Sequence, residues 1–121
     1  MRTRELQENW LIWLDASDRL TRSLHELTVA IILRDSERIN RLRPETQEIR
    51  KQMRDVEEDI DIATQKIASA LGTTTDVRGI ASVLDKIEAQ SVNGLANRVV
   101  VAERTIRYLL EKNEELFRCR Y

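Results

Sequence analysis

The sequence predicts an all-α protein in which two long antiparallel helices form a hairpin, followed by a short helix and a third long helix, packed as a bundle or in coiled-coil fashion. Three long stretches carry apolar or small residues at alternating spacings of three and four, the repeat of one helix face. Apolar residues make up 41% and charged residues 34% of the chain, with three glycines and one proline, a balance typical of a helical bundle. A chain of 121 residues suits one core, so we expect a single domain over residues 1–121.

The first long helix is expected over residues 4–34. We call its row of regularly spaced apolar or small positions a seam. Large residues dominate this seam, and we interpret its two tryptophans as core anchors rather than as a binding site. The seam consists of Leu6, Trp10, Trp13, Ser17, Leu20, Leu24, Leu27 and Ile31.

The end of this helix is apolar on all sides. Val29, Ile32 and Leu33 lie off the seam, next to seam residues Leu27 and Ile31. Either another helix covers this turn from a second side, or the turn is a docking patch. We favour the covered interpretation and leave the other open.

The second long helix is expected over residues 35–71, after a short turn that makes it antiparallel to the first. Asp35 or Ser36 can cap its first turn. Pro44 predicts either a kink or two broken first turns, and the unbroken seam favours the kink. This second seam consists of Ile39, Leu42, Thr46, Ile49, Met53, Val56, Ile60, Ala63, Ile67 and Ala70.

Gly72 predicts the stop of the second helix, and Thr75 or Asp76 is expected to cap a short helix over residues 76–90. That segment has Val77, Ile80, Leu84 and Ile87 on one face. Residues 91–94 are interpreted as a hinge or a helix start. The last long helix is then expected from residue 91 or 93 to residue 118. Its seam consists of Val92, Leu95, Val99, Ala102, Ile106, Leu109, Asn113 and Leu116.

Asn113 is the one strongly polar residue in these seams. A polar side chain at such a position fixes the register of a helix pair or meets a polar group of a partner, at some cost in stability. It can equally mark a frayed helix end. The sequence leaves these alternatives open.

No set of residues in the sequence predicts catalysis, so we expect no enzyme, no cofactor and no metal site. His25 is the only histidine and has no nucleophile or carboxylate placed beside it by sequence. The acidic residues of the segment 55–61 lack the histidines that a helical di-metal site requires, and we interpret them as a solvated helix face.

Charge and cysteine content limit the expected partners and compartment. The formal net charge is −1, and acidic residues interleave with the arginines of the segment 34–43, so nucleic-acid binding is not expected. Cys119 is the only cysteine, which suits a reducing compartment. The longest apolar run, residues 27–33, is far shorter than a membrane span, and the first residues lack the apolar core of a signal peptide. We therefore expect a cytoplasmic protein that binds other proteins through helical surface.

The order of features resembles the FlgN-like flagellar export chaperones. The resemblance rests on the segment LHELTVAIILRDSERINRL at residues 24–42, the ALG stop at residues 70–72 and the segment LLEKNEEL at residues 109–116. It implies a chaperone of bacterial flagellum biogenesis and type III protein export. Its partners would be hook-associated proteins, bound through an amphipathic C-terminal helix, with export-machinery components as further partners. In such chaperones the last helix contacts the cargo, which here corresponds to Val99, Ile106, Leu109, Leu110, Asn113, Leu116 and Phe117.

An alternative interpretation uses the same seams for self-assembly. The protein would then be a structural coiled-coil or helical-bundle scaffold, or an adaptor, that forms a homo-oligomer. Periodicity alone does not separate the two interpretations.

Overall fold

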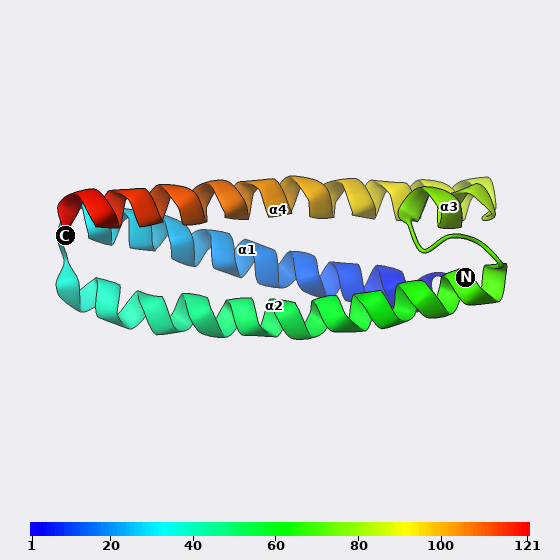
Figure 1. The fold of residues 1–121 in the computed structure, drawn as a ribbon, viewed down its shortest axis with the longest axis horizontal. Coiled ribbons are helices and arrows are strands. Elements are labelled where there is room, and N and C mark those ends of the chain that lie inside the picture. The colour runs from blue at the N-terminus through cyan, green and yellow to red at the C-terminus, as the bar shows by residue number, and fades with distance from the viewer.

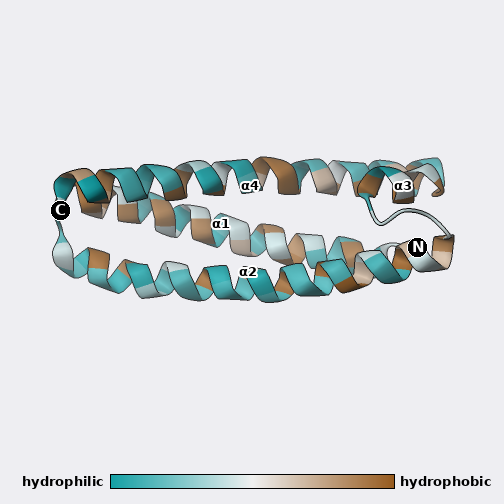
Figure 2. Ribbon diagram, in the orientation of Figure 1, coloured by the Kyte–Doolittle hydropathy of each residue, from teal (hydrophilic) through white to brown (hydrophobic).

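The computed structural model describes all residues, 1–121, and contains helices and no strands, which confirms the all-α prediction (Figure 1). α1 and α2 form the expected antiparallel hairpin, and α4 runs in the same direction as α1. Figure 2 shows hydrophobic segments recurring along all three long helices, separated by hydrophilic ones. The helices are α1 (Arg4–Ile32), α2 (Ser36–Leu71), α3 (Val77–Ser82) and α4 (Lys86–Arg120).

α1 is the central helix of the fold. It packs against α2 and against α4, whereas no Cα atom of α2 lies within 8 Å of a Cα atom of α4. The seam of α1 therefore supplies the core contacts for both neighbours. Trp10 and Trp13 are buried in it, which confirms them as core anchors, and the indole N–H of Trp13 donates to Glu57 of α2 at 3.3 Å.

The turn between α1 and α2 is tight. Arg34 has a φ of 55°, the left-handed conformation, and the N–H of Asp35 donates back to the carbonyl oxygen of Ala30 at 2.9 Å. The Asp35 carboxylate then accepts from the N–H of Arg38 at 3.2 Å, which confirms Asp35 as the cap of α2. One residue thus closes the end of α1 and starts α2.

Pro44 does not break α2. The helix is continuous from Ser36 to Leu71, so the expectation of two broken first turns is wrong. Pro44 and Asn40 are both exposed, and the Asn40 carbonyl that lacks an amide partner at Pro44 lies on the water-facing side of the helix. Water can therefore satisfy the group that the proline leaves unpaired.

The short helix ends earlier, and the last helix begins earlier, than the sequence analysis expected. α3 ends at Ser82, and α4 begins at Lys86 and runs through Gly94 without a hinge. The cause is Asp85, whose carboxylate accepts from the N–H of Glu88 at 2.9 Å and starts a new helix. Ile87 accordingly does not share a buried face with Ile80, and its side chain is exposed.

The connection from α2 to α3 follows the predicted chemistry. Gly72 adopts φ 66° and ends α2, and Asp76 caps α3 by accepting from the N–H of Gly79 at 2.6 Å. A Cβ atom at Gly79 would lie 2.0 Å from the hydroxyl oxygen of Thr74. A larger residue at position 79 would therefore have to displace the Thr74 side chain, although the backbone conformation there does not call for glycine.

We expect the Asp76 cap to make stability depend on pH in the acidic range. The N–H of Gly79, and next the hydroxyl of Thr74, hold the pKa of this carboxyl below its ordinary value, because both stabilise the ionised form. Because folding lowers this pKa, the stability that the Asp76 cap contributes is complete above the unfolded-state pKa. It is lost as the pH falls through the folded-state pKa.

Thermal unfolding of the wild type and of Asp76→Asn between about pH 7 and about pH 2 measures this contribution. The difference in Tm between the wild type and Asp76→Asn should be largest near neutral pH and should disappear in acid. Asp59→Asn is the matched control, since it makes the same substitution at an exposed carboxylate that caps no helix. A gap for Asp76→Asn that stays constant across this range would contradict the assignment.

Candidate functional site

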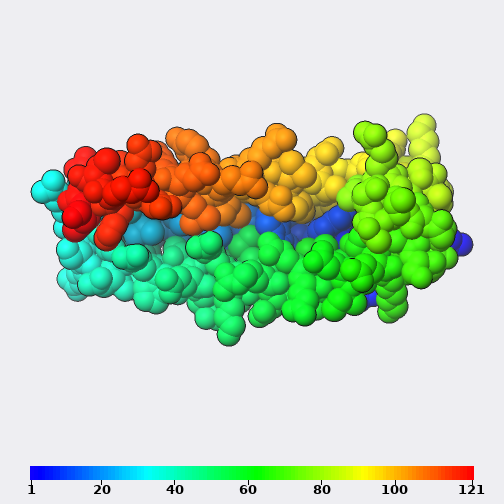
Figure 3. Space-filling view, viewed as in Figure 1, coloured from blue at the N-terminus to red at the C-terminus, as the bar shows by residue number.

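A groove runs between α2 and α4, with α1 as its floor. Figure 3 shows it as a furrow in which the blue atoms of α1 lie between the green of α2 and the orange of α4. Two cavities of about 500 and 450 Å³ lie along it and share Arg50, Arg107 and Leu110 as lining residues, so we treat them as one groove. The groove exists because α2 and α4 both pack on α1 and do not contact each other.

The floor of the groove is the seam of α1 and is already part of the core. Leu24 and Ile31 lie under it and are almost fully buried. The apolar side chains that remain half-buried on its sides are Leu110 and Phe117, both from α4. A helix bound in this groove would contact an apolar floor and two partly accessible apolar side chains.

The two walls of the groove differ in charge. The α2 wall presents three arginines and one glutamate, and the α4 wall presents three glutamates and one arginine. Neither of the ion pairs in the protein crosses the groove, since both join residues of the same helix. The charged residues are Arg43, Arg50, Arg54 and Glu57 on α2, and Glu103, Arg107, Glu111 and Glu114 on α4.

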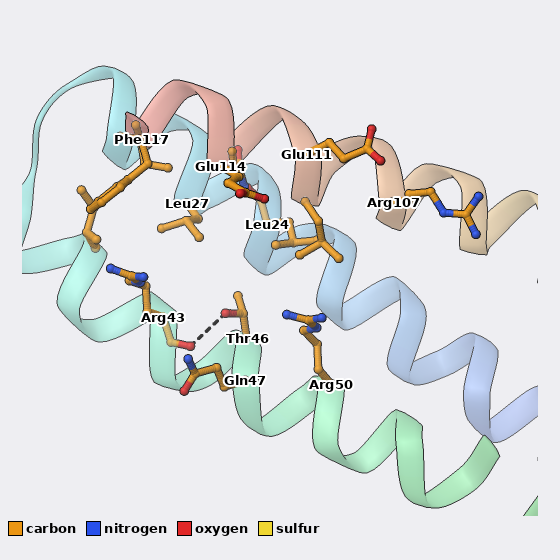
Figure 4. A pocket seen from close by; sticks show the side chains of 14 residues that line it. Leu24, Leu27, Arg43, Thr46, Gln47, Arg50, Arg107, Glu111, Glu114 and Phe117 are labelled. Atoms are coloured by element: carbon orange, nitrogen blue, oxygen red, sulfur yellow. Dashed lines mark hydrogen bonds between the residues drawn. The ribbon is translucent and has the colours of Figure 1, made fainter. Parts of the chain in front are cut away.

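Arg43 is positioned by an aromatic ring from the opposite wall. Its guanidinium carbon lies 5.0 Å from the ring centre of Phe117, a cation–π contact at the end of the groove (Figure 4). Figure 4 also shows Arg50 extending from α2 towards the space between the helices, while Glu111 and Arg107 lie along α4. Arg43 and Arg50 therefore reach into the groove rather than lying on the outer surface.

Asn113 lies beside the groove but serves the core. It is buried, its amide nitrogen donates to the carbonyl oxygen of Leu24 at 3.0 Å, and the hydroxyl of Thr28 donates to its amide oxygen. The frayed-end alternative for Asn113 is therefore wrong. The side chain fixes the register of α4 on α1, because a shift of one turn would leave these buried polar groups without partners.

The seven residues that the resemblance assigned to cargo binding separate into two groups. Ile106, Leu109 and Asn113 are buried against α1 and belong to the core. The other four, Val99, Leu110, Leu116 and Phe117, are half-buried, and only Leu110 and Phe117 of these line the groove. The α2 wall was not anticipated, although the spacing of Arg43, Arg50 and Arg54 by seven and four residues is the repeat of one helix face.

The apolar turn at the end of α1 is only partly covered. Leu27 and Ile31 are buried as expected, but Val29, Ile32 and Leu33 remain 46%, 43% and 65% exposed. The covered interpretation is therefore wrong for these three residues within one chain. α4 packs on the seam of α1, so it does not reach its outer face.

The fold and the groove define an all-helical protein with one central helix, two flanking helices and an open side. No group of three or more histidine, cysteine, aspartate or glutamate side chains is placed to hold a metal ion. None of the helices combines the length and apolar character needed to cross a bilayer. No protein-family model, curated protein or solved structure matches this chain.

Proposed function

We propose that the protein is a cytoplasmic export chaperone that binds an amphipathic helix of a hook-associated protein in the groove between α2 and α4. The observation that carries the proposal is the separation of these two helices, which both pack on α1 and leave one side open. A fourth helix laid there would complete a four-helix arrangement around the seam of α1. The resemblance to FlgN-like chaperones supplies the class of cargo.

The groove has the length that a helical ligand requires. Its lining on α2 runs from Ile39 to Glu57, which corresponds to roughly 27 Å at about 1.5 Å per residue. A helix of about 18 residues would fill it. With only Leu110 and Phe117 partly accessible as apolar contacts, the complex should be reversible, as the handover of an export cargo demands.

The test is a titration with the C-terminal helical segment of a hook-associated protein from the same organism. A one-to-one complex is expected at micromolar concentration. Leu110→Asp combined with Phe117→Asp should weaken it by about 100-fold, because charged side chains would replace the partly accessible apolar contacts. Isothermal titration calorimetry measures both values.

Val101→Asp combined with Tyr108→Asp is the matched control, since both residues lie on α4 and are exposed away from the groove. This control should bind as the wild type does. Absence of binding by the wild type, or an equal loss in the control, would overturn the proposal.

The second candidate function is a scaffold that self-associates. The exposed Val29, Ile32 and Leu33 favour it, because a patch of three large apolar side chains suits contact with a second copy. Sedimentation velocity over a range of concentrations separates the candidates. A dimer that is lost in Ile32→Glu with Leu33→Glu would support the scaffold, and a monomer at all concentrations would exclude it.

A further inference from the structure

We infer that the groove selects a helix that carries carboxylates along one edge, and that this edge lies against α2. The inference rests on the proposed function and specifies the chemistry of the ligand. Arg43, Arg50 and Arg54 follow one another along the groove-facing side of α2 at spacings of seven and four residues. These spacings correspond to roughly 10 and 6 Å along the helix axis.

The three arginines lack counter-ions within the protein. No carboxylate oxygen lies within 4.0 Å of any of their side-chain nitrogen atoms. Arg50 and Arg54 are one helical turn apart and repel each other. A row of carboxylates on a bound helix would relieve this repulsion and form the planar two-bond pairs that arginine favours.

The charges on the two walls disfavour the reverse arrangement, since arginines predominate on α2 and glutamates on α4. Acidic residues of α2, Glu45 and Glu48, line the other side of the helix, where it meets α1. On the α4 wall Glu103 and Glu111 would repel an acidic edge, while Glu114 is paired with Arg118 at 3.2 Å. Arg107 is the only basic residue on this wall, so the ligand edge that faces α4 is neutral or basic.

The experiment uses two synthetic helical peptides of about 20 residues with the same leucine face. One carries glutamate at the positions of a single edge, spaced to match the three arginines, and the other carries glutamine at the same positions. The wild type should bind the glutamate peptide about tenfold more tightly at low salt, and high salt should remove most of the difference.

A protein variant locates the source of this preference. In the triple variant Arg43→Gln, Arg50→Gln and Arg54→Gln the two peptides should bind equally. The control is the triple variant Arg19→Gln, Arg22→Gln and Arg41→Gln, which removes the same charge from exposed positions outside the groove and should keep the tenfold preference.

The outcomes separate this inference from the proposed function. If both peptides bind equally to the wild type, or if the preference survives in the groove variant, the acidic-edge inference is overturned and the helix-binding function stands. If neither peptide nor the hook-associated segment binds, both fail. A helix that binds in the reverse direction places its other edge against α2. The direction of binding therefore reports which edge lies there. A nitroxide at the amino terminus of the glutamate peptide should broaden the protein's NMR signals at one end of the groove only, the end that corresponds to the acidic edge lying on α2.

Discussion

Replacing Leu24 with alanine should lower the free energy of unfolding by about 3 to 5 kcal/mol. Leu24 is 1% exposed and lies in the central core cluster with residues of both α2 and α4, including Met53 and Leu109. Truncation removes apolar contacts with two helices at once, and the rigid seam of α1 limits how far the cavity can close. Urea-induced unfolding followed by circular dichroism measures the change.

Leu11→Ala is the matched control for this prediction. The same substitution is made on the same helix, but Leu11 is 49% exposed. Its effect should stay below about 1 kcal/mol. Similar losses in the two variants would show that α1 is not the centre on which the other helices pack.

Replacing Glu88 with alanine should cost about 2 to 3 kcal/mol. The buried Glu88 carboxylate accepts from the backbone N–H of Thr3 at 2.7 Å and from its hydroxyl at 2.6 Å. Thr3 precedes α1, so a side chain from α4 caps the amino terminus of α1 and meets the positive end of its dipole. Alanine leaves both donors buried without an acceptor.

Chemical denaturation of Glu88→Ala, Glu88→Gln and Glu115→Ala tests this account. Glutamine keeps an acceptor oxygen but not the charge, so its loss should be smaller than that of alanine. Glu115 is exposed on the same helix, and its replacement should change stability by less than about 0.5 kcal/mol. Equal stability of Glu88→Ala and the wild type would show that the contact does not cap α1.

Features set by neighbouring residues could be predicted from the sequence. The cap at Asp35, the stop at Gly72 and the cap at Asp76 depend on side chains that bond to amides a few residues away. The start of α4 was missed for a reason of the same kind. Asp85 and Glu88 have the spacing of a capping pair, but Asn93 and Gly94 carry a competing turn signal that favours a later helix start.

The arrangement of the helices could not be predicted in the same way. Three seams of similar length and apolar character do not indicate which helix becomes the centre. The groove exists because α1 takes that place, and its charged walls lie outside the seams from which the helices are predicted. The resemblance predicts Leu109, Leu110 and Phe117 together at a partner surface. Only the structure shows that Leu109 is buried in the core whereas Leu110 and Phe117 line the groove.

The packing of α4 on α1 also determines the order in which the helix interfaces form during folding. Thr3 contacts Glu88 and Thr28 contacts Asn113, so partners along this interface are separated by 85 residues. The α1–α2 hairpin can close through local contacts, whereas the α1–α4 interface requires a long loop to close first. During synthesis the side of α1 that meets α4 therefore stays uncovered until α4 has left the ribosome, and folding should be slower than that of an up-and-down bundle.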